Sequence, residues 1–278
     1  MEIKFAKMNP TQNMTILVES PVNKTAQVRV ASELMDYGSV YAEQVGFIEK
    51  PKNPEAWARL QMMGGEFCGN ATMSLAALLA LDQALPLQVK CDILLECSGA
   101  EGLVKVETRP GKSSVRCALE MPPPVRIESL VRKIGGRNYK IGLIDLDGII
   151  HFVVPKSAAG EKDRRDWAEK TLKNWAKECC SEAVGLMLHD SESESIEPLV
   201  LVKSTGSLIW ERGCGSGTAA VGAWLAYKES KSIQTTISQP GGEISVKSTF
   251  KTGKVTKVTI TGKVKLAARG SAYLSLEK

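Results

Sequence analysis

Two short segments of the chain nearly repeat each other, and each begins with a Cys-Gly pair. The first is Cys68-Gly69-Asn70-Ala71-Thr72 and the second is Cys214-Gly215-Ser216-Gly217-Thr218. Each pair leads into a proline-free run of good helix formers, at 73–81 and 219–227. We therefore expect each cysteine at the N-terminus of a helix, where unpaired backbone N–H groups and the positive end of the helix dipole favour a thiolate.

Two such thiols could invert a stereocentre next to a carboxylate. Inversion needs a base on one face of the carbon and an acid on the other, both poised near neutral pH. A free thiol has a pKa of about 8.5, which a helix N-terminus lowers. The adjacent N–H groups could bind the carboxylate and the charge that develops on it. A single Cys-Gly pair is more often a small buried residue, but two matched copies 146 positions apart (214 minus 68) favour chemistry.

The remaining cysteines and both histidines are expected to have structural roles. The chain has seven cysteines, an odd number, so we expect free thiols rather than a disulfide framework. No cluster has the spacing of metal ligands, and neither a metal nor a cofactor is expected. His151 is interpreted as a hydrogen-bonded strand residue and His189 as a solvated loop residue. Core or surface thiols are expected at Cys91, Cys97, Cys117, Cys179 and Cys180.

Composition indicates an ordinary globular enzyme. The chain has 278 residues, of which 43% are hydrophobic and 24% charged. The net charge of +5 is scattered among 31 acidic residues, which argues against binding to nucleic acid. The N-terminus lacks a signal-peptide pattern, and the longest apolar run, 75–81, is too short to cross a membrane. We expect a cytoplasmic protein without a membrane partner.

Turn residues and alternating patterns predict a chain made mainly of strands. A third helix is expected from Lys162 to Cys180, and a polar loop at 189–195. The three prolines at 122–124 interrupt both helix and sheet and suggest a domain boundary. Strands are expected at 14–19, 26–31, 45–49, 87–97, 103–108, 114–121, 140–144, 149–154, 199–203, 235–238, 243–248 and 254–261.

The two Cys-Gly segments, half a chain length apart, suggest a duplicated architecture of two lobes. The first lobe would comprise residues 1–121 and carry Cys68, and the second would comprise residues 122–264 and carry Cys214. A final strand within 265–278 could return to the first lobe. Lobes that face each other would direct both helix N-termini into one cleft.

Five segments in order resemble a known family. They are 8–18, 43–49, 65–74, 207–219 and 239–242, and together they span both halves of the chain. They are similar to the diaminopimelate-epimerase-like, cofactor-independent two-cysteine racemases, and within them to the histidine racemases that supply D-histidine for opine-type metallophores. The resemblance implies an α+β fold of two pseudo-symmetric lobes. Each lobe would be a curved, mostly antiparallel sheet around a central helix, with the active site in the cleft between lobes.

The resemblance also implies roles for individual residues. Cys68 and Cys214 correspond to the two acid/base residues, and Glu43 to the residue that recognises the substrate side chain. A carboxylate suits an imidazole N–H, although Glu43 could also be an exposed glutamate at a strand end. The remaining substrate-binding residues implied are Asn13, Gly69, Asn70, Glu211, Gly215 and Ser216. The implied partners are free histidine, a second copy in a homodimer, and a downstream metallophore synthase.

Departures from the family pattern leave alternatives open. Glu211-Arg212-Gly213 directly precedes Cys214 without the spacing found in diaminopimelate epimerases, and the Asn-Pro expected before His151 is replaced by Ile149-Ile150. These differences argue against diaminopimelate as the substrate, and Arg212 departs from the histidine racemase pattern. The alternatives are a racemase for another basic or polar amino acid and a non-catalytic amino-acid-binding relative. A dinucleotide loop at 213–217 is a weak third, because no strand-helix-strand unit accompanies it.

Overall fold

The chain forms two compact units. The structure is a computed structural model that describes residues 1–160, 163–203 and 206–275. One unit comprises Met1–Glu120 with Thr261–Lys278, and the other comprises Met121–Ile260. The strand β16 (Lys254–Tyr273) contributes residues to both. Each unit is described by itself.

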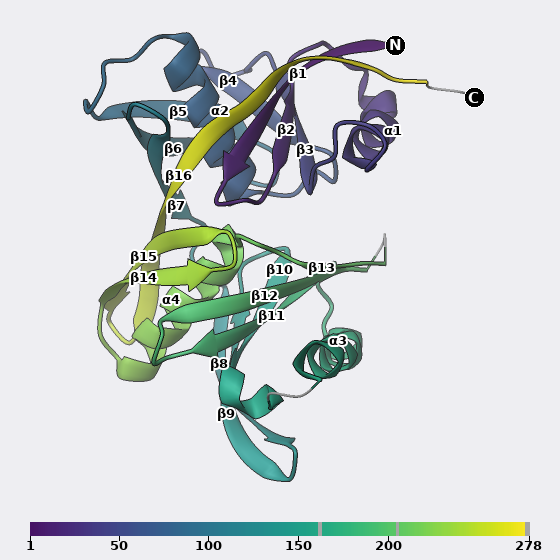
Figure 1. The fold of residues 1–278 in the computed structure, drawn as a ribbon. Helices are drawn as coiled ribbons and strands as arrows, with labels where there is room; N and C mark the ends of the chain where they lie inside the picture. The colour runs from purple at the N-terminus through teal and green to yellow at the C-terminus, as the bar shows by residue number, and fades with distance from the viewer. Residues whose placement is uncertain (161–162, 204–205, 276–278) are drawn as a thin grey trace. The chain divides into compact units, whose positions relative to one another are not determined.

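The first unit is a closed ring of strands. The sheet runs in the order β1-β2-β3-β4-β5-β6-β7-β16, and β16 pairs back onto β1 in antiparallel register, with Phe5 opposite Gly270 (Figure 1). The pairs β2–β3 and β4–β5 are parallel. The strands before β16 are β1 (Glu2–Pro10), β2 (Thr15–Val18), β3 (Gln44–Glu49), β4 (Ala58–Met62), β5 (Cys91–Cys97), β6 (Leu103–Pro110) and β7 (Val115–Met121).

Two helices pack against this ring. The helix α2 (Gly69–Asp82) contacts strands β1 to β6 and is buried along nearly its whole length, as its continuous run of apolar residues requires. The helix α1 (Lys24–Met35) buries Gln27, Val30, Ala31 and Leu34, which are spaced as one helical face. The strand predicted at 26–31 is therefore wrong, because this period of three to four residues is helical.

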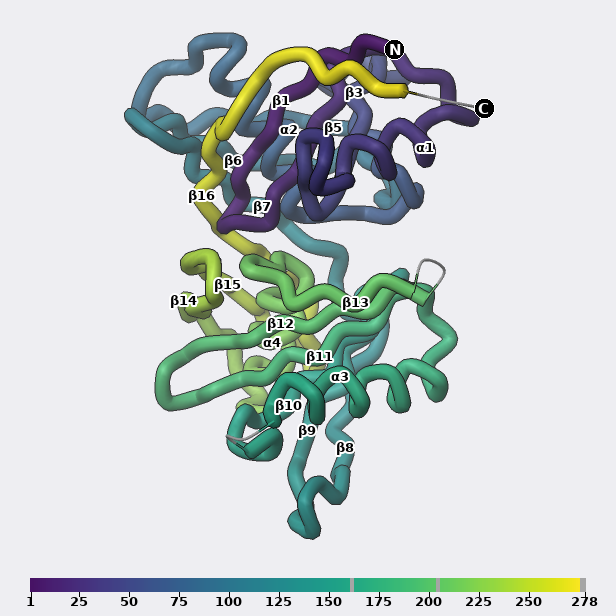
Figure 2. The backbone as a smooth tube through the Cα atoms, turned by 45° about the vertical axis from the view of Figure 1, so that its right-hand side comes forward, coloured from purple at the N-terminus to yellow at the C-terminus, as the bar shows by residue number. Residues whose placement is uncertain are grey.

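The second unit repeats the same order of elements. In each unit an antiparallel strand pair is followed by a helix and then by a strand parallel to the second strand of that pair. Next comes an antiparallel partner of that strand, and after a Cys-Gly helix comes a strand parallel to this partner. The path runs from β16 through β15-β14-β12-β11-β10-β9 to β8, with β13 paired to β12 and a long β8–β9 hairpin (Figure 2). The strands are β8 (Arg126–Ile134), β9 (Arg137–Asp145), β10 (Ile149–Pro155), β11 (Ala183–Asp190), β12 (Ser195–Val202), β13 (Ser207–Trp210), β14 (Ile233–Gln239) and β15 (Gly242–Lys251).

The sheet of the second unit has two different faces. Ile150, Phe152 and Val154 of β10 pack in one core with Ala168 and Leu172 of the helix α3 (Arg164–Trp175). Alternate residues of β10 point to the opposite face, where the helix α4 (Gly215–Glu229) contacts the strand. Short 3₁₀ turns at Lys156–Ala159 and Ala176–Glu178 flank α3. This alternation places His151 on the side of α4.

Several boundaries differ from the predictions. The helix expected from Lys162 to Cys180 ends as an α-helix at Trp175, and Lys162 lies outside the described residues. The strand expected from Leu87 begins only at Cys91, because Gln88 has a φ of 62° that ends extended structure. No described helix has the length and apolar character needed to cross a membrane.

The interpretation of His189 as a solvated loop residue is wrong. His189 lies in β11 and is 8% exposed, and the turn follows it. Its burial lowers the pKa of the imidazole.

Candidate active site

The two Cys-Gly pairs open their helices in the same way. Cys68 has extended backbone angles (φ −124°, ψ 111°) and is the N-cap of α2, and Cys214 (φ −112°, ψ 108°) is the N-cap of α4. Each sulfur accepts a hydrogen bond from the N–H three residues later, Ala71 at 3.4 Å and Gly217 at 3.2 Å. The two sulfurs therefore replace the oxygen of the usual Ser, Thr or Asp caps. A thiolate at either position gains a backbone donor and the positive end of a helix dipole.

Both caps are reinforced by a threonine one turn later. The hydroxyl of Thr72 donates to the carbonyl of Cys68 at 2.8 Å, and that of Thr218 donates to the carbonyl of Cys214 at 2.7 Å. Because the backbone of each cysteine is fixed by these bonds, its side chain starts from a defined direction. This explains why both segments read Cys-Gly-x-x-Thr.

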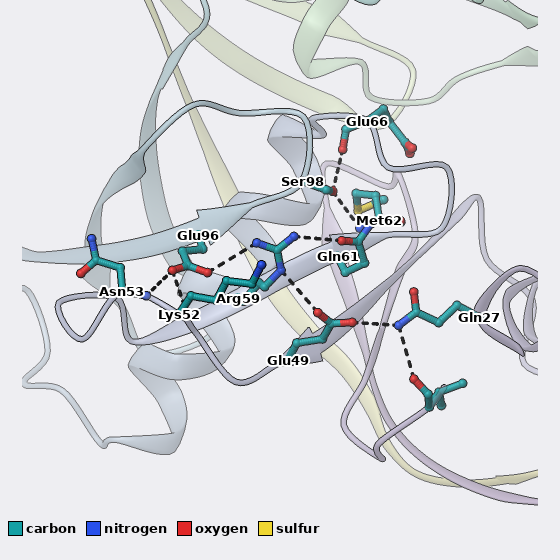
Figure 3. A network of polar contacts seen from close by, with 11 residues as sticks. Gln27, Glu49, Lys52, Asn53, Arg59, Gln61, Met62, Glu66, Glu96 and Ser98 are labelled. Atoms are coloured by element: carbon teal, nitrogen blue, oxygen red, sulfur yellow. Dashed lines mark hydrogen bonds and ion pairs between the residues drawn. The ribbon is translucent and has the colours of Figure 1, made fainter. Parts of the chain in front are cut away.

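The loop that leads into Cys68 is anchored by Ser98. The Ser98 hydroxyl donates to the carbonyl of Glu66 at 2.9 Å and accepts from the N–H of Met62 at 2.9 Å (Figure 3). A side chain on the next residue, Gly99, would place its Cβ 2.3 Å from the backbone nitrogen of Phe67. The close approach requires glycine there and holds the loop against the end of β5.

An ion-pair network links β4 to its neighbouring strands β3 and β5. Arg59 of β4 lies 3.4 Å from Glu96 of β5 and 3.3 Å from Glu49 of β3, and Glu49 accepts a hydrogen bond from Gln27 of α1 at 2.9 Å (Figure 3). Backbone N–H groups of Asn53 and Lys52 lower the pKa of the Glu96 carboxyl, so it stays ionised. The network joins three strands and a helix of the first unit.

The sulfur of Cys68 also meets a side-chain amide. Cys68 is half-buried, and its S–H donates to the Oε1 atom of Gln44 at 3.0 Å. The Nε2 atom of Gln44 donates to Asn13 at 2.6 Å, and Asn13 donates in turn to Glu43 at 2.7 Å. Asn13 is 2% exposed. The structure thus brings Asn13, Glu43 and Cys68 into one hydrogen-bonded set.

Cys214 has a drier environment. It is 2% exposed, and burial raises the pKa of its thiol well above the usual range. The nearby Glu211 carboxylate raises the pKa of the Cys214 thiol further, whereas the Ser216 hydroxyl and the Gly217 N–H act in the opposite direction. Burial and the neighbouring carboxylate thus both favour the protonated form of Cys214.

His151 supports the Cys214 cap through Ser216. Its Nε2 atom lies 3.0 Å from the Ser216 hydroxyl, which lies 3.5 Å from the Cys214 sulfur. Among the described residues the Nδ1 atom has no hydrogen-bond partner. The favoured tautomer carries its proton on Nε2, where an acceptor is present, which leaves the Ser216 hydrogen free to donate to Cys214. Burial lowers the pKa of His151 to about 3, so this imidazole stays neutral.

Gln239 brackets the peptide of Cys214. Its Oε1 atom accepts from the N–H of Cys214 at 2.7 Å, and its Nε2 atom donates to the Thr218 hydroxyl at 2.8 Å. Arg212 donates to the carbonyl of Pro240 at 3.1 Å, which ties the same loop to the segment after β14. These contacts give the 239–242 motif a structural role.

The predicted site residues thus fall into two groups, one in each unit. Asn13, Glu43, Gly69 and Asn70 surround Cys68 or open its helix. Glu211, Gly215 and Ser216 surround Cys214 or open its helix. Three residues that hold the cysteines carry no signal in the sequence: Gln44, Gln239 and Thr72. Gln44 and Gln239 lie in the motifs 43–49 and 239–242, but nothing in these motifs indicates which side chain reaches a cysteine.

The five other cysteines lack comparable surroundings. All are free, and burial raises the pKa of Cys97 to about 11 and of Cys117 to about 12. Cys179 also has a pKa raised by burial, Cys180 is exposed and Cys91 is half-buried. None of them is the N-cap of a described helix.

Comparison with solved structures shows the fold. The chain is similar to a probable proline racemase from Agrobacterium radiobacter K84, with a TM-score of 0.70, 14% identity and coverage of 99% of this chain and 93% of that one. It is also similar to a PhzF-family phenazine biosynthesis protein from Bacillus anthracis, with a TM-score of 0.71, 13% identity and coverage of 99% and 100%. The chain therefore has the mixed, sheet-rich fold of these proteins, with a closed barrel and few helices.

Sequence comparison identifies the family. A family model described as the histidine racemase CntK N-terminal domain matches residues 2–273. A histidine racemase from Staphylococcus aureus (strain Mu50) is 33% identical over 275 residues, which is 98% of each chain. A histidine racemase from Fusobacterium nucleatum is 33% identical over 279 residues, covering 98% of this chain and 97% of that one. The resemblance in the sequence motifs is thus confirmed: the chain belongs to the histidine racemase family and is an isomerase.

Proposed function

We propose that the protein interconverts L- and D-histidine without a cofactor, using Cys68 and Cys214 as paired acid and base. The observation that carries the proposal is the matched geometry of the two cysteines, each the N-cap of a helix with its sulfur hydrogen-bonded to a first-turn N–H. The proposal requires two pseudo-symmetric lobes that present these sulfurs to opposite faces of one substrate carbon.

The reaction balances without oxidation or reduction. One cysteine, as thiolate, takes the proton from Cα, and the electron pair of that C–H bond moves into the carboxylate. The other cysteine, as thiol, gives its proton to the opposite face of Cα, and the two thiols have then exchanged protonation states. First-turn N–H groups of Gly69, Asn70, Gly215 and Ser216 would bind the carboxylate and the charge gathered on it, because N–H groups and the positive dipole end at a helix N-terminus favour an anion.

Acidic and amide side chains would provide specificity. Glu43 lies within the hydrogen-bonded set of Cys68, and its carboxylate can accept from an imidazole N–H. Asn13 and Asn70 are proposed as amide contacts to the substrate, and Glu211 as an acidic contact beside Cys214. A site with carboxylates favours a basic side chain over an acidic one.

The proposal extends to the use of the product. D-histidine would pass to a synthase that builds an opine-type metallophore, and the racemase would act as a homodimer. A cytoplasmic location belongs to the same proposal and is supported by seven free cysteines.

The decisive experiment follows hydrogen exchange at Cα. The protein is incubated with L-histidine in deuterated water without pyridoxal phosphate, and both D-histidine formation and deuterium incorporation are measured. Cys68→Ser and Cys214→Ser should each abolish turnover, since serine supplies no comparable base, while the exposed Cys180→Ser control should retain it.

The other substrates are tested in the same assay. A panel of basic, polar and acidic amino acids, including diaminopimelate, replaces histidine. Full activity in either serine variant would contradict the two-base mechanism. If another amino acid is turned over faster than histidine, that amino acid replaces histidine as the proposed substrate.

A further inference from the structure

A continuous series of side-chain hydrogen bonds joins Glu43 to the sulfur of Cys68. Asn13 donates to Glu43 at 2.7 Å, Gln44 donates to Asn13 at 2.6 Å, and Cys68 donates to Gln44 at 3.0 Å. The hydroxyl of Thr15 also accepts from Gln44, at 2.7 Å. All of these residues belong to the first unit.

The Glu43 carboxylate determines which group donates and which accepts in each of these hydrogen bonds. An ionised carboxylate has no hydrogen to donate, so the Asn13 group that faces Glu43 must be the NH₂. The oxygen of the Asn13 amide then faces Gln44, which must present its own NH₂ in return. The Gln44 oxygen is left to face Cys68.

The contacts of Thr15 independently fix the same orientation of the Gln44 amide. Its hydroxyl hydrogen is committed to the backbone carbonyl of Asn13 at 3.1 Å, so its oxygen accepts from Gln44. Two acceptors at one end of the Gln44 side chain both require its NH₂ group. An amide flip would break both hydrogen bonds at once, and buried polar groups left without partners are costly.

We propose that Gln44 is a positioning residue that holds the proton on Cys68 by directing a fixed acceptor oxygen at the sulfur. The thiol form of Cys68 donates to Gln44, and the thiolate form keeps the Ala71 N–H at 3.4 Å. Each protonation state thus has its own partner. The Gln44 oxygen repels the thiolate, which makes that thiolate a stronger base than the helix N-terminus alone would give.

The charged group at the far end of this series of hydrogen bonds is Glu43. The first turn of α2 carries no acidic residue. Glu66, two residues before Cys68, turns its carboxylate toward Gly64, where a Cβ would lie 2.5 Å from it. The proposed recognition residue and the proposed acid/base residue are therefore linked through two side-chain amides. This assignment rests on the proposed function only in treating Cys68 as an acid/base residue.

The test measures the pH dependence of Cys68 alkylation in the substrate-free protein. Folded protein is treated briefly with iodoacetamide across a pH series, and modification of the Cys68 peptide is followed by mass spectrometry. Gln44→Met removes the acceptor and should lower the midpoint by about one pH unit, which is a roughly tenfold larger thiolate fraction below the midpoint. Gln44→Glu keeps the shape, places an anion beside the sulfur and should raise the midpoint.

The matched control is Gln61→Met, the same substitution at a glutamine of β4 that donates to the carbonyl of Met62 instead. Its midpoint should equal that of the wild type. The proposal is overturned if Gln44→Met leaves the midpoint unchanged or raises it, or if Gln61→Met shifts it equally. If Gln44→Met does not fold, Gln44→Glu decides, and an unchanged midpoint there overturns the proposal.

The outcome is separable from the function proposed above. Alkylation needs no substrate, so shifted midpoints in a protein that does not racemise histidine would support the role of Gln44 and refute the proposed activity. Unshifted midpoints in an active racemase would overturn the role of Gln44 and support the proposed activity.

Discussion

Replacing His151 with glutamine should make the second unit more resistant to acid relative to the wild type. His151 is fully buried, its Nδ1 atom has no partner among the described residues, and burial lowers its pKa to about 3 from an ordinary 6.5. Below pH 6.5 the unfolded chain binds a proton at this residue that the folded chain does not bind. The stability contributed by His151 is therefore fully present above pH 6.5 and is lost as the pH falls toward 3.

The size of the effect follows from the two pKa values. One proton contributes a slope of about 1.4 kcal/mol per pH unit to the free energy of unfolding. Between pH 6 and pH 4 the loss amounts to about 2–3 kcal/mol in the wild type. Glutamine does not titrate, and its amide can still reach the Ser216 hydroxyl, so the variant should lack this part of the pH dependence.

Urea unfolding at several pH values provides the assay. Tryptophan fluorescence reports mainly on the second unit, which contains Trp167, Trp175, Trp210 and Trp224. Only the slope against pH is compared, so any stability lost by the substitution itself cancels. Parallel slopes for wild type and variant between pH 6 and pH 4 would refute the argument that His151 is held neutral by burial. His189→Gln is the companion variant, because burial lowers the pKa of His189 in the same direction and the chain has only two histidines.

Three further outcomes are expected. Gly185→Ala should lower the unfolding free energy by about 1–3 kcal/mol in urea titrations, because its Cβ would lie 2.1 Å from the His151 ring, whereas Gly270→Ala, with open space around it, should be near neutral. Alkylation of the folded protein at pH 8 should modify the exposed Cys180 first and the buried Cys97 and Cys117 last; early modification of the latter two would contradict their raised pKa values. Racemisation started from L- and from D-histidine should show different kcat values with KM changed by the same factor, and equal kcat values at every pH would show that the two thiols are equivalent.

Local features of the site could be predicted from the sequence. A cysteine before a run of helix formers is an N-cap in either unit, because the donors it needs lie within its own first turn. The helix α1 was missed because its buried face is short and includes a polar residue, Gln27, while Val28 and Val30 resemble a strand. The burial of His189 was missed because neighbours in the sheet decide it, and its polar surroundings in sequence indicate the opposite.

The partners of the cysteines could not be predicted in the same way. Gln44 lies 24 positions from Cys68 and Gln239 lies 25 positions from Cys214, so only the folded sheet brings either amide to its cysteine. A glutamine carries no pattern of its own in sequence, since its amide can donate or accept and its role depends on what surrounds it. The direction of the Gln44 amide is set by Asn13 and Thr15, which belong to yet another segment.

The two halves of the chain share one way of capping a helix but surround their thiols differently. Cys68 meets a directed acceptor and is half-buried, while Cys214 is almost fully buried with a hydroxyl on one side and a carboxylate nearby. Unequal thiols are compatible with racemisation, because mirror-image substrates have equal free energies and the ratio kcat/KM must then be the same in both directions. The inequality can appear only in how that ratio divides between kcat and KM. A racemase therefore does not require matching surroundings for its two thiols, and the Gln44 and Ser216 contacts are where the two units differ around the sulfur.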